Sequence, residues 1–153
     1  MSHIGKTAPD FSLLNTNREA VSLSGLRGGK VVLAFFPAAF TGVCEKEVCA
    51  FQDALASFND VGATVLGISV DGPFANAAFA AKNNINFPIL SDYGRDAVNA
   101  YGIGIDNFAG MNGYTAANRC VFVIDEAGVV TYEWTAPNPG VEPNYDEVKA
   151  AVS

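Results

Sequence analysis

Cys44 is the residue whose type and surroundings best suit chemistry in this sequence. It follows a strongly apolar run, Val31 to Phe36, which ends at Pro37 and passes through a short loop into a helical pattern with Cys44 in its first turn. The N-terminus of a helix carries partial positive charge and favours a thiolate over a thiol. Since an ordinary thiol, with a pKa of about 8.5, is mostly protonated near neutral pH, this placement predicts a nucleophilic cysteine.

A strand and a helix position this cysteine. Residues 31–36 are apolar at both odd and even positions, which indicates a central strand covered on both faces. The helix expected from Thr41 to Gly62 repeats apolar residues at spacings of three and four, and so turns a face that includes Cys44 and Phe51 to the core. Thr41 is a candidate N-cap of this helix.

The remaining pattern predicts one α/β domain with a mixed sheet. We expect an N-terminal hairpin, a second parallel strand followed by a helix, a short strand and helix, a long loop, a C-terminal hairpin and a last helix. In chain order these elements cover residues 11–14 with 20–23, 63–70, 73–83, 87–90, 95–101, 102–117, 119–125 with 129–134, and 145–152. No repeat or linker divides the chain, so residues 1–153 are expected to form a single domain.

Charge and cysteine content argue against several classes of partner and location. A net charge of −7 disfavours nucleic acid and anionic membrane surfaces as partners. Three cysteines are an odd number in a chain of 153 residues, which is large enough to bury its own core and is unlike a disulfide-framed secreted domain. No apolar run has the length of a signal peptide or a membrane span. We therefore expect a cytoplasmic protein.

The segment before and including Cys44 resembles a known motif. Residues 37–44, Pro-Ala-Ala-Phe-Thr-Gly-Val-Cys, match the P-x-x-x-T-x-x-C motif of the peroxiredoxins, which are thiol peroxidases with a thioredoxin-like fold. Residues 31–36 and the downstream segment 119–125 also fit, and the likeness covers nearly the whole chain, in particular to the bacterioferritin-comigratory and AhpE-like branches. The resemblance implies a thioredoxin-like α/β fold with a central mixed sheet, flanking helices and an N-terminal hairpin.

The resemblance also implies a mechanism. Cys44 would attack the O–O bond of hydrogen peroxide or an organic hydroperoxide, become a sulfenic acid and release water or an alcohol. Arg119 would hold the thiolate and orient the peroxide, the Thr41 hydroxyl would hydrogen-bond the peroxide or the sulfur, and Pro37 would shield the thiolate from water. The chemistry calls for no cofactor and no metal. Thioredoxin or a similar thiol would be the reductant, and the chain would form a homodimer or a larger ring.

Glu47 and Cys49 lie further along the same expected helix. Glu47 matches a position that is often acidic in the family, and it either helps to order Arg119 or is an ordinary first-turn carboxylate favoured by the helix dipole. Cys49 follows Cys44 by five residues. On an intact helix the two side chains point roughly 140° apart and cannot bond without local unwinding. A similar spacing occurs in the bacterioferritin-comigratory branch, so Cys49 is a candidate resolving cysteine, with an external thiol as the alternative.

Other functions for the cysteines have less support in the sequence. Cys120 adjoins Arg119 on a strand and is expected to face the opposite way and fill the core. The main alternative function is thioredoxin-class disulfide exchange without peroxidase activity, although the expected C-x-x-C pair is missing. A cysteine hydrolase would need a histidine base, and the only histidine is His3 near the terminus. The sequence also lacks paired zinc ligands, and a non-catalytic module would not need Cys44, Thr41 and Arg119 together.

Overall fold

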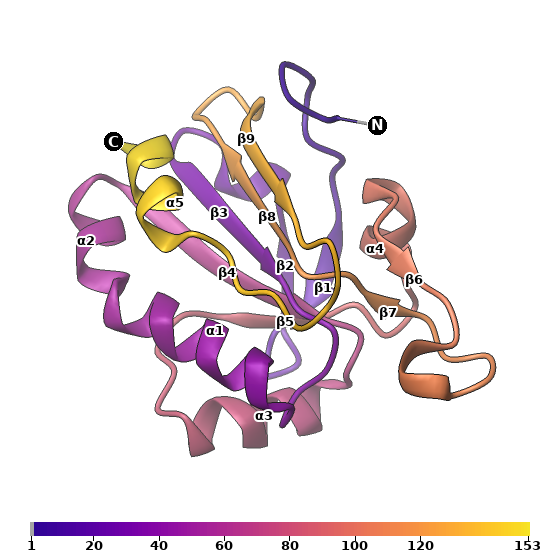
Figure 1. The fold of residues 1–153 in the computed structure, drawn as a ribbon. Coiled ribbons are helices and arrows are strands. Elements are labelled where there is room, and N and C mark those ends of the chain that lie inside the picture. Colours follow the sequence, from indigo (N-terminus) through magenta and orange to yellow (C-terminus); the bar gives the residue numbers. More distant parts are fainter. Residues whose placement is uncertain (1) are drawn as a thin grey trace.

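A mixed β-sheet with helices on both faces forms the body of the molecule (Figure 1). The strands are β1 (Ser12–Leu14), β2 (Ala20–Ser22), β3 (Lys30–Phe35), β4 (Ala63–Ser69), β5 (Ile89–Ser91), β6 (Gly104–Ile105), β7 (Ala116–Ala117), β8 (Cys120–Ile124) and β9 (Val130–Thr135). The helices are α1 (Gly42–Asp53), α2 (Leu55–Asp60), α3 (Pro73–Lys82), α4 (Asp96–Tyr101) and α5 (Tyr145–Val152), with 3₁₀ turns η1 (Ser24–Leu26) and η2 (Phe108–Gly110). This is a computed structural model, and it describes residues 2–153.

The main sheet has seven strands in the order β2-β1-β5-β4-β3-β8-β9 across the described residues. β4 pairs in parallel with both β3 and β5, and the other neighbours are antiparallel. The predicted mixed sheet and N-terminal hairpin are therefore confirmed, and the hairpin joins the main sheet through β1 and β5. Within residues 2–153, no helix has both the length and the apolar character needed to cross a membrane.

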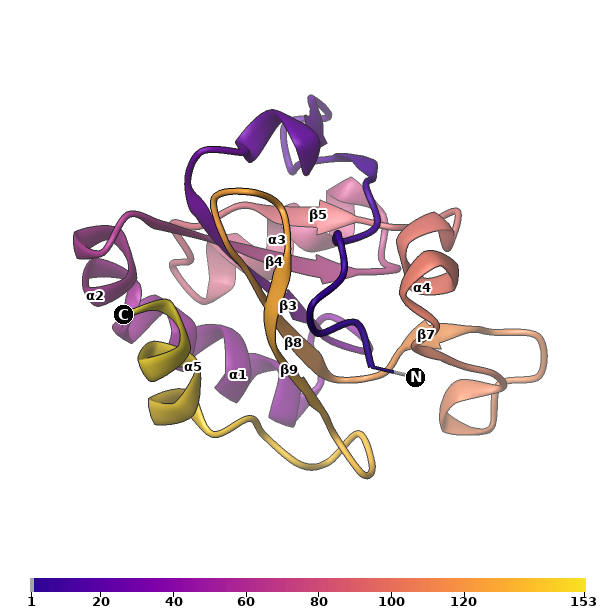
Figure 2. The same cartoon turned by 90° about the horizontal axis from the view of Figure 1, so that it is seen from above.

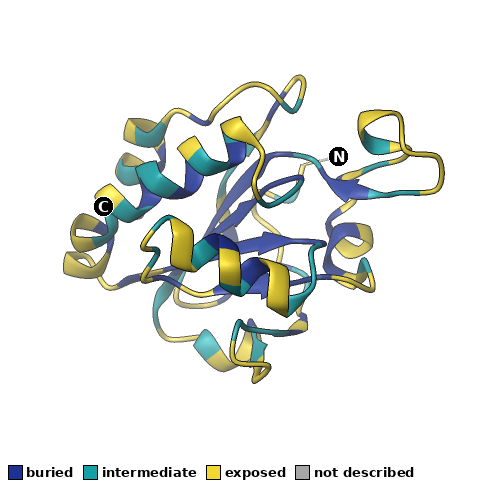
Figure 3. Cartoon of the chain, turned by 90° about the horizontal axis from the view of Figure 1, so that it is seen from below, coloured by how far each residue is buried: buried dark blue, intermediate teal, exposed yellow. Residues whose placement is uncertain are grey.

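Both faces of the central strand β3 are buried, as its apolar run predicts. Leu33 and Phe35 belong to one buried cluster, while Val32 and Ala34 belong to another. Helices α1, α2, α3 and α5 supply side chains to the second cluster, and α4 supplies side chains to the first. Figure 3 shows the buried strands between these helical layers. The alternation of β3 thus separates two cores, and α1 packs on one of them.

The single helix expected from Thr41 to Gly62 is wrong, because two helices occupy this range. α1 ends at Asp53, and Ala54, with φ −92° and ψ −1°, separates it from α2. Phe58 of α2 still reaches the core beside Phe51 of α1, with ring centroids 6.0 Å apart. The apolar spacing therefore predicts the buried face correctly but does not reveal the break.

The segment expected to be one long loop, residues 102–117, contains a short antiparallel pair. Ile105 of β6 pairs with Ala116 of β7, and η2 lies between the two strands. Two views show this hairpin projecting from the edge of the molecule (Figures 1 and 2). Strands of two residues are too short for alternation to be visible in the sequence. The expected strand at 87–90 is also displaced, because β5 runs from Ile89 to Ser91.

The topology brings three segments that are distant in the sequence to the same end of the central strands. The parallel register of β3 and β4 sets Phe35 beside Ile68, so the loops that follow these strands meet. The antiparallel register of β3 and β8 sets Phe35 beside Cys120, so Arg119, which directly precedes β8, lies at the same end. The loop that leads to Cys44 therefore starts where Arg119 enters the sheet.

Candidate active site

Cys44 is the third residue of α1 and is completely buried. β3 ends at Phe35, Pro37 is buried behind it, and the chain turns through residues 38–41 into the helix. The backbone amides of a first helical turn have no partners within the helix, and their partial positive charge stabilises an anion placed there. Cys44 thus lies in the first turn of the helix, where the sequence places it.

Arg119 donates a hydrogen bond from Nη2 to the Cys44 sulfur at 3.2 Å. The two residues are 75 positions apart in the chain, and Arg119 is 1% exposed. Its side chain reaches α1 on one face of the sheet, while Cys120 packs in the cluster on the other face. The guanidinium is therefore in direct contact with the cysteine that the sequence predicts to be the nucleophile.

Glu47 binds the same guanidinium. Its Oε1 accepts a hydrogen bond of 2.6 Å from Nη1 of Arg119, whereas its Oε2 is buried and has no hydrogen-bond partner among residues 2–153. Burial raises the pKa of Glu47 to about 7, although the attraction of Arg119 opposes this change. Burial lowers the pKa of Arg119, but Glu47 and Cys44 raise it by more, so that it lies above its usual value. Glu47 is in the second turn of α1, so the expectation of a first-turn carboxylate is wrong.

A backbone carbonyl that the sequence did not reveal completes the surroundings of Arg119. The oxygen of Pro139 accepts from Nε at 3.1 Å and from Nη2 at 2.8 Å. The backbone of Arg119 is held as well, because Asn118 Oδ1 accepts from its amide and Ala136 donates to its carbonyl. Pro137, Pro139 and Pro143 predict irregular structure between the last strand and the last helix. Their side chains do not indicate where a backbone carbonyl will point.

Thr41 and Pro37 flank the loop before the helix. Thr41 occupies the N-cap position of α1, but its side chain makes no capping hydrogen bond. Its hydroxyl instead donates to the carbonyl of Ala38 at 2.9 Å, so the predicted side-chain cap is wrong. Thr41 is exposed and Pro37 is buried. The hydroxyl oxygen of Thr41 still has lone pairs with which to accept a hydrogen bond.

Cys49 is not bonded to Cys44 in the folded chain. α1 is continuous between them, and the Cys49 sulfur donates to Asn83 Oδ1 at 3.6 Å. Burial, followed by the nearby charges of Asp53 and Glu45, raises the pKa of the Cys49 thiol. All three cysteines are free. A disulfide between Cys44 and Cys49 therefore requires the helix to unwind.

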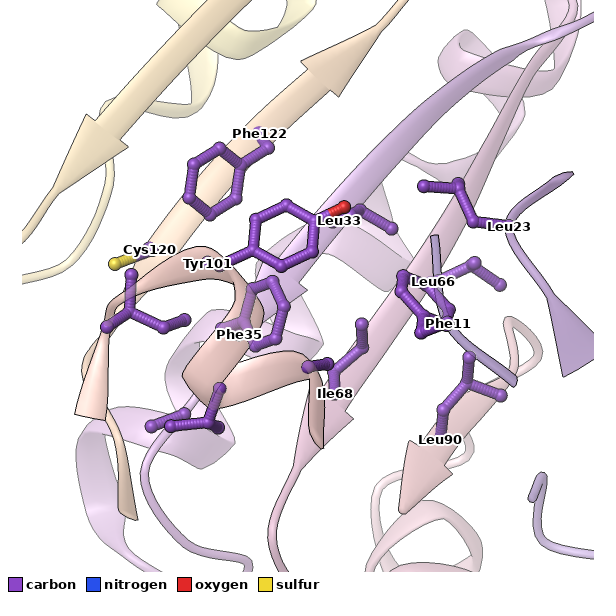
Figure 4. Packing of buried hydrophobic residues seen from close by; sticks show 14 of the residues in the cluster. Phe11, Leu23, Leu33, Phe35, Leu66, Ile68, Leu90, Tyr101, Cys120 and Phe122 are labelled. Carbon is purple, nitrogen blue, oxygen red and sulfur yellow. The ribbon is translucent and has the colours of Figure 1, made fainter. Parts of the chain in front are cut away.

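Cys120 packs in the opposite core. Figure 4 shows it in the cluster that also contains Phe35, Tyr101 and Phe122. Its sulfur lies 3.7 Å from Oγ1 of Thr135, and burial raises the pKa of the thiol to about 11. Cys120 is therefore a buried thiol on the other side of the sheet from Cys44, as strand alternation predicts.

The fold is a thioredoxin-like sheet, and a buried cysteine lies at the start of one of its helices. An arginine that directly precedes a separate strand donates a hydrogen bond to this cysteine. These features define a thiol-based oxidoreductase. Comparison with known proteins identifies the family. Residues 4–133 match the model of the AhpC/TSA family. Alkyl hydroperoxide reductase E of Mycobacterium tuberculosis is 38% identical over 134 residues, which cover 86% of this chain and 84% of that protein.

Solved structures give the same result. Peroxidoxin BcpB from Mycobacterium tuberculosis has a TM-score of 0.87 and 30% identity, over 99% of this chain and 97% of that chain. A peroxiredoxin-like protein from Aquifex aeolicus has a TM-score of 0.87 and 31% identity, over 97% of this chain and 85% of that chain. The chain belongs to the AhpC/TSA family and is a peroxiredoxin, a thiol-dependent peroxidase that takes a peroxide substrate and a thiol reductant.

Replacing Glu47 by Gln should flatten the pH dependence of stability. The pKa of Glu47 is about 7 in the folded protein, against an ordinary value of 4.5 in the unfolded chain. Between these two pH values the folded protein keeps a proton on Glu47 that the unfolded chain has lost. The free energy of unfolding should therefore decrease as the pH rises from about 4.5 to about 7, by at most about 3 kcal/mol from this residue. Urea unfolding of the reduced protein at pH 5 and pH 7.5 measures the decrease, and Glu47→Gln should lose most of it.

Glu45→Gln is the matched control, because Glu45 lies on the same helix in a partly exposed ion pair with Lys82. The pKa of Glu45 is lowered by that partner, so Glu45 stays ionised across this pH window, and its variant should keep the decrease of the parent. Equal decreases in the parent and in Glu47→Gln would show that Glu47 is not the titrating group.

Proposed function

We propose that this peroxiredoxin reduces hydrogen peroxide and organic hydroperoxides with Cys44 as the nucleophile. The observation that carries the proposal is the 3.2 Å hydrogen bond from Arg119 to the Cys44 sulfur in a buried site. The guanidinium of Arg119 and the N-terminus of α1 both present positive charge to the same sulfur, which is the atom that must attack the peroxide. The name of the relative alkyl hydroperoxide reductase E supports organic hydroperoxides as substrates.

The proposed reaction begins with a displacement at oxygen. An electron pair of the Cys44 thiolate forms an S–O bond to the terminal peroxide oxygen, and the O–O bond breaks. The departing oxygen leaves as hydroxide or alkoxide and takes a proton from solvent to give water or an alcohol. Cys44 becomes a sulfenic acid, oxidised by two electrons, while the peroxide is reduced by the same two electrons.

Arg119, Thr41 and Pro37 have distinct proposed roles. Negative charge moves from sulfur to the departing oxygen, and the guanidinium of Arg119 is already in place to stabilise both ends of that movement. Because Thr41 donates its proton to a backbone carbonyl, its oxygen is suited to accept a hydrogen bond from the peroxide O–H. Pro37 is buried next to the strand end and keeps water from one side of the thiolate.

Disulfide exchange without peroxidase activity has no comparable support. That chemistry uses two cysteines that can bond readily, and Cys49 lies on the far side of an intact helix from Cys44. The sulfur of Cys44 is also completely buried, which disfavours direct attack on a protein disulfide.

Variants of Cys44 and Arg119 should differ in their effect, because Cys44 is the proposed nucleophile and Arg119 is the group proposed to orient the peroxide. Cys44→Ser should abolish stoichiometric peroxide consumption by the reduced protein, and Arg119→Ala should slow it by at least about 100-fold, the usual effect of removing one preplaced donor. Rapid-quench measurement of the peroxide that remains gives both rates. Arg18→Ala, which removes an exposed arginine, is the charge control and should react like the parent.

Arg119→Ala leaves Glu47 buried without its cation, so a second variant separates catalysis from folding. The double variant Arg119→Ala/Glu47→Gln removes the unpaired carboxylate and should still be slow. A parent-like rate in either arginine variant would remove Arg119 from the mechanism, and parent-like consumption by Cys44→Ser would refute Cys44 as the nucleophile.

Cys49 is the proposed resolving residue. Its thiolate would attack the sulfur of the Cys44 sulfenic acid, forming the disulfide and releasing hydroxide, which leaves as water after protonation. The position of both residues on one helix supports this proposal, because unwinding part of α1 is enough to bring them together. The raised pKa of Cys49 implies a slow step near neutral pH, since little thiolate is present.

Oxidation of Cys120→Ser protein by one equivalent of hydrogen peroxide should therefore produce a Cys44–Cys49 disulfide. Peptide mass spectrometry identifies the bond, and its formation rate should increase about tenfold per pH unit below the pKa of Cys49, in proportion to the thiolate fraction. Cys49→Ser should retain the sulfenic acid instead. Persistence of the sulfenic acid in Cys120→Ser would assign resolution to an external thiol.

The reductant, compartment and assembly are further parts of the proposal. Thioredoxin or a similar thiol fits the peroxiredoxin class, and three free cysteines fit a reducing compartment such as the cytoplasm. Strands near both ends of the chain, β1 and β9, share one sheet, which supports a single domain for residues 1–153, of which Met1 lies outside the described residues.

A homodimer is the proposed assembly. Exposed aromatic side chains support it, since Phe40 is 49%, Phe74 73% and Tyr93 55% exposed in the single chain. Sedimentation equilibrium of the reduced protein should give twice the mass of the chain. A monomer mass across the micromolar range would contradict the dimer.

A further inference from the structure

One carboxylate ties the loop before Cys44 to the end of the neighbouring strand. The amide of Ala39 donates to Oδ2 of Asp71 at 2.8 Å. Asp71 follows β4, and the loop follows β3, its parallel neighbour in the sheet (Figure 1). The adjacent strand ends therefore place an acceptor directly beside the backbone of the loop.

The backbone of this loop needs such a tether because it is strained. Phe40 has a φ of 66°, in the left-handed region, which is unfavourable for a residue with a side chain. Conformations of this kind persist only where the surroundings fix them on both sides. The bond from Ala39 to Asp71 fixes the residue before Phe40, and the bond from the Thr41 hydroxyl to Ala38 fixes the residue after it.

Asp71 is itself held by a buried polar network. The Ser69 hydroxyl lies 2.8 Å from Oδ2 of Asp71, and the Asp71 amide donates back to the Ser69 oxygen at 3.2 Å. The same hydroxyl lies 3.1 Å from Oδ1 of Asn76, whose amide nitrogen donates to Ser91 at 3.0 Å. Ser69, Asn76 and Ser91 are buried, so the acceptor for the loop is anchored in β4, α3 and β5.

We infer that Asp71 is a positioning residue for peroxide reduction: it fixes the loop from Pro37 to Thr41 and thereby the groups that receive the peroxide at Cys44. The inference rests on the proposed function of Cys44. The loop presents the Thr41 hydroxyl and sets the start of α1, and Asp71 acts on both through the amide of Ala39. Misplacement of reacting groups by about 1 Å lowers rates by roughly 100-fold, so a single tether at this point has a large effect.

The test compares Asp71→Ala, Asp71→Asn and Asp125→Ala with the parent. Asp71→Ala removes the acceptor, whereas Asp71→Asn retains an oxygen that can accept from Ala39. Asp125→Ala is the matched control, because the Asp125 carboxylate accepts the amides of Ala127 and Val129 in the turn at the other end of β8. Three readouts are measured on the reduced protein: the rate of Cys44 oxidation by hydrogen peroxide, the rate of Cys44 alkylation by iodoacetamide, and hydrogen exchange at the Ala39 amide.

Asp71→Ala should lower the peroxide rate by roughly 10- to 100-fold while alkylation stays equal or becomes faster. Alkylation does not depend on an oriented peroxide, so opposite changes in the two rates distinguish lost orientation from a damaged thiol. The Ala39 amide should exchange at least about tenfold faster, because its acceptor is gone. Asp71→Asn should recover the peroxide rate to within about threefold, and Asp125→Ala should match the parent in all three readouts.

A peroxide rate in Asp71→Ala within twofold of the parent, or an equally slow Asp71→Asn, would overturn the inference. Unchanged exchange at Ala39 in Asp71→Ala would overturn the tether itself. A parent protein whose Cys44 does not react with peroxide would instead refute the proposed function, and the exchange measurement would still report on the tether.

Discussion

The buried guanidinium of Arg119 is the interaction on which the site depends. A lone buried charge is strongly unfavourable, and here the Cys44 sulfur, the Glu47 carboxylate and the Pro139 carbonyl together offset that cost. One positive charge thus faces two groups that can each be negative. Burial raises the pKa of Glu47 to about 7 in spite of this cation. Arg119 therefore joins two side chains of α1 to the start of β8.

The sheet makes this arrangement possible because it brings together strand ends that are far apart in the sequence. The end of β3 supplies the loop to Cys44, the antiparallel start of β8 supplies Arg119, and the parallel end of β4 supplies Asp71. Register fixes these positions because both faces of β3 are buried, and a shift of one residue would exchange the two cores. The same packing that stabilises the fold therefore sets the geometry at the Cys44 sulfur.

Much of this site can be predicted from the sequence, and the remainder has physical reasons for being hidden. The apolar run of β3, the helical spacing around Cys44 and the motif from Pro37 indicate the strand, the helix and the candidate nucleophile. Side-chain alternation also places Cys120 in the core opposite Arg119. The carbonyl of Pro139 could not be predicted, because every residue has a carbonyl and only the folded backbone gives it a direction.

Contacts between side chains and backbone explain the other differences. Thr41 has the residue type and position of an N-cap, but its hydroxyl donates to the carbonyl of Ala38, and its oxygen accepts no backbone amide of the first helical turn. Asp71 has the appearance of an ordinary residue at the start of a helix, and its bond to Ala39 depends on the pairing of β3 with β4. The break at Ala54 has no glycine or proline to mark it.

Helix α1 has two requirements that oppose each other. Its intact first turn stabilises the proposed thiolate, whereas a bond between Cys44 and Cys49 requires the helix to unwind.

Three contacts hold α1 against the end of α3 and the residues that follow it. They are the ion pair of Glu45 with Lys82, the contact of Cys49 with Asn83, and the hydrogen bond from the Asn86 amide to Gln52. Any excursion that brings Cys49 to Cys44 must loosen these contacts as well as the helix. The free energy of that opening is therefore set by the junction of α1 with α3 in addition to the active site, and the partly exposed ion pair contributes only a modest part of it.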